Sequence, residues 1–153
     1  MQKSKIFIVL SWVVFVIACS SNANKYKPSD HTKAYADEKA LTLMQNTCFS
    51  CHNPDMNIDK RLAPPMFMVR NHYYDSLISK EDFVNKIVSW AMNPNDSMSI
   101  MPGAVRNFGM MPKQMFKEED LKIIAAYIYE NDLESDAWYA TWEAHKNKAN
   151  PAK

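Results

Sequence analysis

The sequence predicts an all-α domain. Three segments, about residues 37–51, 80–92 and 118–131, place apolar residues three and four positions apart, which is the period of a helix with one buried face. No segment alternates apolar and polar residues strongly enough to compete as a β-strand. A chain of 153 residues is expected to form one domain, and it can bury roughly two thirds of its unfolded surface.

The first 18 residues have the composition of a secretory signal. Lys3 and Lys5 precede the apolar run IFIVLSWVVFVIA, which is shorter than the roughly 20 residues that span a bilayer. The run ends in VIAC, which resembles the lipobox of bacterial lipoproteins. In that family the signal is cut before the cysteine, and the new N-terminus is acylated. The resemblance implies that Cys19 is lipidated and holds the chain to a membrane, on the periplasmic side.

Two other interpretations of this segment stay open: an uncleaved helical anchor, or an ordinary signal with an unrelated cysteine. Residues 19–35 are polar and lack an apolar period, so we expect the lipidated cysteine to be followed by a flexible tether. His31 in this stretch is expected to be a solvated linker residue. Removal of Lys3 and Lys5 with the signal changes the net charge from +1 to −1, a balance that implies no nucleic-acid partner.

The first two predicted helices differ in how clearly their ends are marked. The helix over residues 37–51 has one apolar face, made of Leu41, Met44, Cys48 and Cys51. The helix over residues 80–92 begins with a pair that resembles a capping box, Ser79 and Asp82, and Pro94 ends it. Its apolar face consists of Phe83, Val84, Ile87, Val88 and Ala91.

The third predicted helix, over residues 118–131, carries acidic residues in its first turn, where the helix dipole favours negative charge. Lys117 occupies the N-cap position, so this start should be frayed or capped in another way. Its apolar face is formed by Leu121, Ile124, Ala125 and Ile128. A shorter packing helix is expected over residues 136–146, with Trp138, Trp142 and His145 on one face.

Two of the three cysteines belong to the motif CFSCH, from Cys48 to His52. A disulfide or a redox-active pair is one interpretation, and half of a zinc site is another. The chain lacks a second ligand pair for zinc, and it lacks the βαβ pattern that accompanies thioredoxin-like motifs. CxxCH is the attachment signature of c-type haem, in which two thiols add to the vinyl groups and the adjacent imidazole ligates the iron.

With its flanking motifs, the chain resembles a class I monohaem cytochrome c. The helix that runs into the haem motif in this family is matched by EKALTLMQNTCFSCHN, the proline-bearing loop by APPMFMV, and the distal-ligand segment with the last helix by MPKQMFKEEDLKIIAAYIYEN. CxxCH lies early in this chain, whereas cytochromes of the four-helix-bundle type carry it near the C-terminus. The resemblance implies a cytochrome domain over residues 36–132, with three core helices around one covalently attached haem, and a C-terminal extension over residues 133–153.

The resemblance also implies the ligands. Cys48 and Cys51 would attach the haem, and His52 would be the proximal ligand. Met111 is the expected distal ligand, because Pro112 follows it and its distance from the last helix agrees with the family pattern. Met101 and Met110 remain alternatives, and distal ligation by His72 would give a bis-histidine site with a lower potential. The chain has 11 methionines, and most of the others are expected to fill gaps around a large flat cofactor.

Second-sphere groups follow from the same resemblance. The carbonyl of Pro64 would accept the free N–H of His52, which fixes the tautomer of the ligand, and Pro65 is the alternative alignment. The haem propionates could form ion pairs or hydrogen bonds with Arg70, Arg106 and Asn107. Trp90 and Tyr127 are most simply core residues or packing residues for the haem.

An iron with both axial positions filled has no place for substrate, so we expect an electron carrier and not an enzyme. Its partners would be respiratory electron donors and acceptors, and a membrane tether would raise its concentration near them. Two alternatives stay open. One is a gas- or peroxide-binding haem sensor or small enzyme whose distal methionine is labile. The other is a haem module docked in a larger oxidoreductase, with the tail over residues 132–153 as its contact surface.

Overall fold

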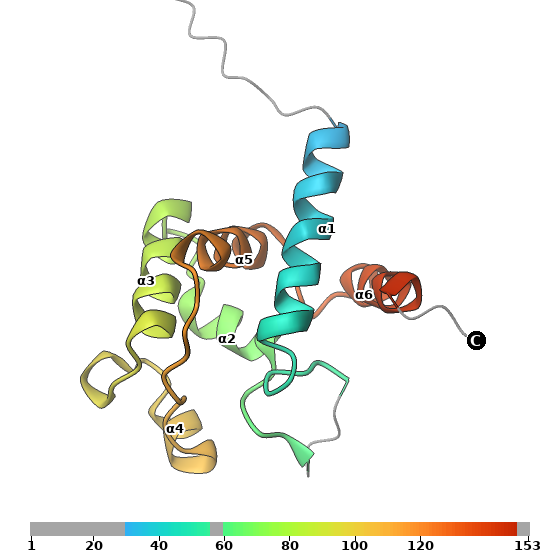
Figure 1. The fold of residues 1–153 in the computed structure, drawn as a ribbon. Coiled ribbons are helices and arrows are strands. Elements are labelled where there is room, and N and C mark those ends of the chain that lie inside the picture. The colour runs from blue at the N-terminus through green and yellow to red at the C-terminus, as the bar shows by residue number, and fades with distance from the viewer. Residues whose placement is uncertain (1–29, 56–59, 150–153) are drawn as a thin grey trace, which may run out of the picture.

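The computed structural model describes residues 30–55 and 60–149, and all the regular structure in these residues is helical. This confirms the prediction of an all-α fold (Figure 1). The elements are α1 (Asp30–Thr47), α2 (Met66–Tyr73), α3 (Lys80–Met92), the 3-10 helix η2 (Asp96–Met98), α4 (Pro102–Phe108), α5 (Glu118–Glu130) and α6 (Asp136–Ala149).

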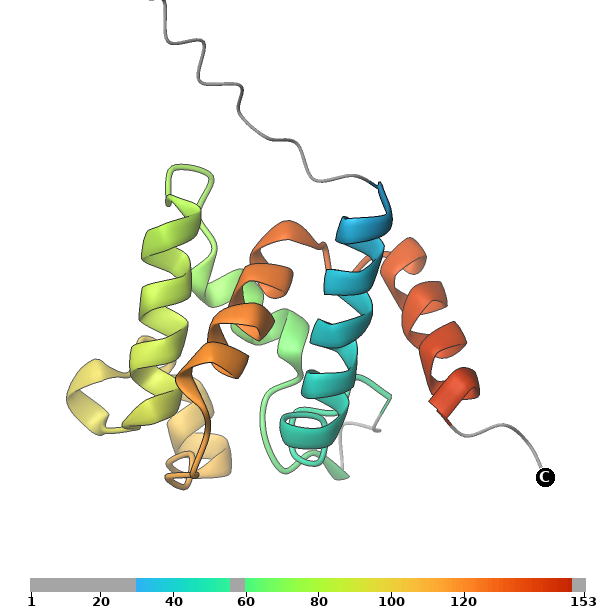
Figure 2. The same cartoon turned by 45° about the horizontal axis from the view of Figure 1, so that its top comes forward.

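Helix α5 lies between α3 and α1 and packs against both. Helix α6 packs on α1, on the side away from α5, and α2 packs on α3 (Figures 1 and 2). Helix α4 and the C-terminal ends of α1 and α3 lie toward the same end of the molecule. The described part of the chain therefore has a core of three helices, with α2 and α6 packed beside it and α4 at the end where α1 and α3 finish.

The main core joins the buried faces of these helices. Phe83 and Met44 are fully buried at its centre, and Ile128 of α5 is 1% exposed. Burial of a large apolar side chain stabilises the fold by roughly 1.5–3 kcal/mol. The other members are Ala40, Leu41, Phe49, Met66, Tyr73, Ile87, Ile124, Ala125, Tyr127, Leu133, Trp138 and Trp142.

Helix α3 has the bounds that the sequence predicts. The Ser79 hydroxyl accepts a hydrogen bond from the backbone N–H of Asp82 at 3.0 Å and donates to the Asp82 carboxylate at 2.7 Å. The side-chain cap satisfies one of the N–H groups that a helix start leaves unpaired. The predicted capping pair is therefore confirmed. The Asp82 carboxylate, however, accepts from the hydroxyl of Ser79, whereas in a full capping box it would accept from the backbone N–H of Ser79.

Helix α1 begins earlier than predicted, at Asp30 instead of residue 37, so residues 30–35 of the expected tether are helical. Lys33 forms an ion pair with Asp37 at 2.9 Å, one turn apart along this segment. Pairs at this spacing support a helix by roughly 0.2–0.5 kcal/mol. Apolar periodicity missed this extension because residues 32–36 are exposed and the helix there has no buried face.

Helices α5 and α6 agree with the prediction in their buried faces. Helix α5 begins after Lys117 without a side-chain cap, as expected. Helix α6 buries Trp138, Trp142 and His145, also as expected, but it continues past residue 146 to Ala149. The expected C-terminal extension is therefore a packed helix in the part that the structure describes.

Helices α2 and α4 were not predicted. Pro65 is the N-cap of α2, and its carbonyl accepts from the backbone N–H of Met68 at 2.9 Å. Helix α4 starts with Pro102 and ends at Gly109, whose φ of 80° lies in the region that favours glycine. Proline at a helix start and glycine after its end are sequence signals for a helix. Both helices are too short for apolar periodicity to indicate them.

The expected signal, Cys19 and most of the tether lie outside the described residues. Within residues 30–55 and 60–149, none of the helices combines the length and the apolar character needed to cross a membrane.

Candidate functional site

The CxxCH segment forms a compact turn directly after α1. The backbone N–H groups of Cys48 and Phe49 both donate to the carbonyl of Met44, at 2.8 and 2.9 Å, and the helix ends there. The N–H of His52 then donates to the carbonyl of Cys48 at 2.8 Å. The predicted helix over residues 37–51 is wrong at this end, because the shared acceptor tightens the chain before Cys51 is reached.

Both thiols of the motif are free, and they differ in exposure: Cys48 is half-buried and Cys51 is exposed. Burial raises the pKa of the Cys48 thiol, although its hydrogen-bond contact with Thr47, at 3.3 Å, acts in the opposite direction. Phe49, which lies between them in the sequence, is anchored in the core, where its side chain is only 3% exposed. The turn therefore presents its sulfur atoms from an apolar base.

One of the two ring nitrogens of His52 forms a hydrogen bond within the chain. Its Nδ1 lies 2.6 Å from the carbonyl oxygen of Pro64. A carbonyl can only accept, so Nδ1 carries the proton and Nε2 keeps its lone pair. Burial lowers the pKa of His52, and the bond to Pro64 opposes this only in part, so the imidazole stays neutral at neutral pH. A neutral imidazole with a fixed tautomer is the form in which histidine binds metals.

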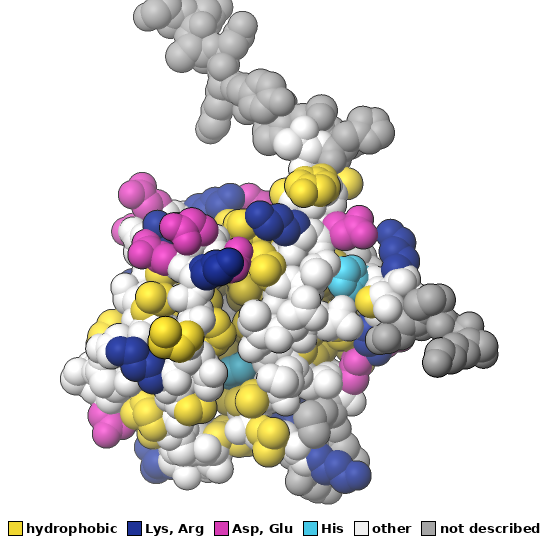
Figure 3. All heavy atoms as spheres, viewed as in Figure 1, with side chains coloured by type: hydrophobic (Ala, Val, Ile, Leu, Met, Phe, Trp, Pro, Cys, Tyr) yellow, Lys and Arg dark blue, Asp and Glu magenta, His cyan; other side chains and the backbone are white. Residues whose placement is uncertain are grey.

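A cavity of about 270 Å³ brings the motif together with residues far along the chain. Cys48, Cys51 and His52 line it from one side, with Pro64 beside them. Figure 3 shows hydrophobic side chains gathered around a hollow where α4, α5 and the end of α1 meet. The further walls are apolar side chains of α2, α3 and α5: Met66, Val69, Tyr73, Ile87, Trp90, Leu121, Ile124 and Ile128.

The three candidate methionines also line this cavity, and they come from the segments directly before and after α4. Met101, before α4, and Met110 and Met111, after Gly109, all line it and are all half-buried. Met115 is fully exposed and does not line it. The lining of the cavity thus combines two thiols, one imidazole and several thioethers.

His72 lies elsewhere. It is exposed, and its Nδ1 donates to the carbonyl of Met68 at 2.8 Å. It lines a second cavity of about 390 Å³ between α2 and α4, which adjoins the first at Pro64, Met101 and Phe108, but His72 is not among the residues that line the first. Bis-histidine ligation in the first cavity is therefore not supported by this arrangement. Asn107 also lines the second cavity.

Arg70 and Arg106 do not line the first cavity. Nε of Arg70 donates to the carbonyl of Ile128 at 3.0 Å, near the end of α5, and its guanidinium lies 4.3 Å from the centroid of the Tyr74 ring. Arg70 thus satisfies one of the unpaired carbonyls at a helix end.

Trp90 and Tyr127 separate in the structure. Trp90 lines the first cavity, whereas Tyr127 is buried in the core and accepts a hydrogen bond from Nε1 of Trp138 at 3.0 Å. Burial raises the pKa of Tyr127 to about 12, and that of Tyr73 in the cavity wall also to about 12. Both phenols are therefore neutral at neutral pH, and Tyr73 adds no charge to the wall of the cavity.

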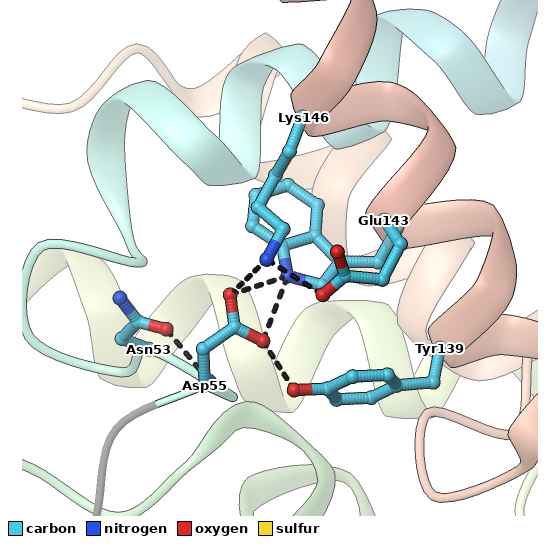
Figure 4. A network of polar contacts seen from close by, with 6 residues as sticks. Asn53, Asp55, Tyr139, Glu143 and Lys146 are labelled. Atoms are coloured by element: carbon cyan, nitrogen blue, oxygen red, sulfur yellow. Dashed lines mark hydrogen bonds and ion pairs between the residues drawn. The ribbon is translucent and has the colours of Figure 1, made fainter.

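Sequence reasoning missed the residues on the outer side of the CxxCH turn. Asp55 accepts hydrogen bonds from three side chains of α6: Tyr139, Trp142 at 3.1 Å and Lys146 at 2.5 Å (Figure 4). Its backbone N–H donates to the side chain of Asn53 at 2.7 Å, which forms an Asx turn. Asn-Pro-Asp is a turn signal in the sequence, but no local pattern indicates its partners on α6.

The donors in the first cavity restrict what it could hold. Within the described ranges no three His, Cys, Asp or Glu side chains gather as a site for a bare metal ion. The cavity instead offers two thiols, one imidazole and thioethers inside apolar walls. This set fits a flat apolar cofactor that is attached through sulfur and brings its own metal, with imidazole and thioether as axial donors.

Comparisons with protein-family models, with curated proteins and with solved structures found no match to this chain. The functional proposal therefore rests on the residues and on their arrangement.

Proposed function

We propose that this chain is an exported one-electron carrier, built as a class I cytochrome c around one covalently attached haem. Helices α1, α3 and α5 would be the three core helices of that fold. The observation that carries the proposal is one apolar cavity that holds both CxxCH thiols, the His52 imidazole and methionine thioethers. The neutral, correctly oriented His52 ring is further support.

Each of these residues would have its own role in binding the haem. Cys48 and Cys51 would hold the cofactor through thioether bonds, and His52 would offer Nε2 to its iron. Pro64 keeps the ring in place by accepting the Nδ1 proton at 2.6 Å. When bound, the haem supplies one-electron exchange at its iron. The apolar walls exclude water, which limits the stabilisation of the oxidised, more positive state.

Met111 is the proposed distal ligand. It lines the same cavity as the CxxCH turn, and Pro112 follows it, as in the family that the sequence resembles. Met110 and Met101 line the same cavity, so the choice among them rests on the sequence pattern. If His52 and a thioether both bound the iron, no position would stay open for substrate, and electron transfer is the function that such ligation would favour.

Electron exchange would take place where the cavity opens. Leu62 and Phe108 line the cavity and are 64% and 39% exposed, so an apolar edge is available to partner proteins there. The partners would be respiratory electron donors and acceptors. Lipidated Cys19 would tether the carrier to the membrane in which they lie, a part of the proposal that rests on the VIAC pattern alone.

The docked-subunit alternative is not favoured by α6. The apolar face of this helix, with Trp138 and Trp142 at 5% and 2% exposure, packs within the chain. A partner that binds the tail over residues 132–153 would therefore have to use the other faces of α6.

The test is covalent haem attachment in the full chain, made in a bacterial host with a cytochrome c maturation system. We expect wild type to retain haem on a denaturing gel, and the double variant Cys48→Ser, Cys51→Ser to lose it. Cys19→Ser is the matched control and should keep the haem. A wild-type chain without covalent haem would overturn the proposal.

A second measurement separates an electron carrier from a gas-binding protein. The reduced, haem-loaded chain is exposed to carbon monoxide without denaturant. An unchanged spectrum is expected if His52 and a methionine close the iron. Ready binding of carbon monoxide would replace the carrier by a sensor or a small enzyme.

A further inference from the structure

One side chain of α6 contacts both the CxxCH motif and the loop that follows it. The ring of Trp142 packs edge to face on Phe49, with 4.8 Å between centroids and an interplanar angle of 76°. Phe49 lies between the two cysteines of the motif. Nε1 of the same tryptophan donates to the carboxylate of Asp55 at 3.1 Å, three residues after His52. Trp142 therefore joins the inside of the motif to the loop that follows it.

The polar part of this contact has three donors on one face of α6. Tyr139, Trp142 and Lys146 are spaced three and four residues apart, so successive turns of the helix aim them at one carboxylate (Figure 4). Lys146 is also held by Glu143 at 2.7 Å. The Asx turn from Asn53 fixes the backbone of Asp55. Both sides of the contact are thus ordered by their own elements.

The apolar part of this contact is buried. Phe49 and Trp142 are 3% and 2% exposed, and aromatic pairs in this geometry add stabilisation beyond the area that they bury. The CxxCH turn itself is held by turn hydrogen bonds and by the bond from His52 to Pro64 on its cavity side. Helix α6 supplies the contacts on the opposite, outer side.

We propose that α6 is a clamp that holds the CxxCH turn in the shape needed for haem attachment, with Asp55 and Trp142 as its positioning residues. The inference rests on the proposed function, because a positioned motif has a purpose only if a cofactor is attached there. Attachment requires two thiols and one imidazole to face the same cavity at the same time. A turn that is gripped on both sides loses less freedom at that step than a mobile one does.

The first test uses the full chain made without haem. Alkylation of half-buried Cys48 by iodoacetamide is followed by mass spectrometry of its peptide, with exposed Cys51 as the internal reference. We expect Trp142→Phe and Asp55→Asn each to speed the alkylation of Cys48 roughly tenfold, a change in the opening equilibrium that corresponds to about 1.4 kcal/mol. Amide exchange in α3 monitors global unfolding in the same samples.

Trp138→Phe is the matched control. Trp138 lies on the same helix and donates to Tyr127 at 3.0 Å, away from the CxxCH turn. It should leave the rate at Cys48 within about twofold of wild type. The clamp is refuted if Trp138→Phe speeds Cys48 as much as Trp142→Phe does, or if neither Trp142→Phe nor Asp55→Asn changes the rate.

The second test is the midpoint potential of the haem-loaded chain. A looser turn admits water near the iron and favours the oxidised state, so Trp142→Phe and Asp55→Asn should lower the potential relative to Trp138→Phe. Equal potentials in all three variants would refute a positioning role. A wild-type chain without covalent haem would instead refute the proposed function, while the alkylation rates would still decide whether α6 holds the turn.

Discussion

Nδ1 of His52 donates to the carbonyl oxygen of Pro64 at 2.6 Å. The bond joins the turn after α1 to the residue two positions before α2, and it decides which ring nitrogen faces the cavity. Because the acceptor belongs to the backbone, substitution of Pro64 leaves it in place. The orientation of the ring is therefore a property of the fold and not of one side-chain pair.

This relationship predicts the tautomer of His52. In the full chain without haem, at neutral pH, the ring should be neutral and protonated at Nδ1, because burial lowers its pKa and a carbonyl faces that nitrogen. Nitrogen-15 spectra of histidine-labelled protein report the tautomer directly, and the variant His52→Gln assigns the signal. A ring protonated at Nε2 would contradict both the geometry and the ligand role.

The contact between Asp55 and α6 predicts an acid limit of stability. Burial alone would raise the pKa of Asp55, but hydrogen bonds from Lys146, Tyr139 and Trp142 outweigh it and lower the pKa below its ordinary 3.8. The unfolded chain therefore binds this proton more readily than the folded one. The stabilisation is complete above pH 3.8 and is lost as the pH falls through the lower folded-state value.

Urea unfolding of the full chain between about pH 2.5 and about pH 7 measures this effect, because that range includes the ordinary pKa of a carboxyl group. Wild type should lose more stability than Asp55→Asn over the acid part of that range, because only the carboxylate titrates. Glu118→Gln, which removes an exposed ion pair with Lys122, is the control and should follow wild type. Parallel curves for wild type and Asp55→Asn would show that the contact does not depend on the charge.

The cap of α3 predicts a stability loss without loss of the site. Ser79→Ala removes the hydrogen bond to the N–H of Asp82 and should cost about 1 kcal/mol in the free energy of unfolding. Lys117→Ala, at the N-cap of α5, removes no side-chain cap and should change it by less than about 0.5 kcal/mol. Denaturant unfolding of both variants decides, and equal losses would mean that the Ser79 hydroxyl does not stabilise α3.

The sequence was most informative where one helix face carries the signal. The bounds of α3 and its cap at Ser79 were predictable because a strong apolar period and a marked start coincide. The end of α1 was not, because Cys48 and Cys51 continue the apolar period after the helix has already ended at Thr47. The three-residue separation of the two cysteines belongs to the CxxCH motif, but it also matches the period of a helix.

The candidate site divides in the same way. The CxxCH residues and the candidate methionines were recognisable from local patterns, and the structure places them on one cavity. The partners of Asp55 were not recognisable, since Trp142 and Lys146 are 87 and 91 positions away in the chain. A contact between a carboxylate and donors so distant in the chain produces no periodic pattern in the sequence. The cytochrome fold itself remains a prediction from the motifs.

The membrane tether predicts the behaviour of Cys19. Wild-type chain should partition with membranes and incorporate labelled fatty acid, because acyl chains bury their CH₂ groups in the bilayer. Cys19→Ala should lose the label and keep the haem-binding domain intact. Retention of the label in Cys19→Ala, or its absence from wild type, would contradict lipidation at this position and would return the segment to an ordinary signal or an uncleaved anchor.

The distal ligand is decided by three matched variants, Met101→Ala, Met110→Ala and Met111→Ala, in the haem-loaded chain. Met111→Ala alone should abolish the sulfur-to-iron charge-transfer band of the oxidised protein. It should also lower the midpoint potential, because a thioether favours the reduced iron. Met115→Ala is the control, since this side chain is fully exposed and does not line the cavity. If Met101→Ala or Met110→Ala abolishes the band while Met111→Ala retains it, the ligand is reassigned but the electron carrier stands. If wild type lacks the band and binds carbon monoxide, the iron is open and the carrier proposal fails.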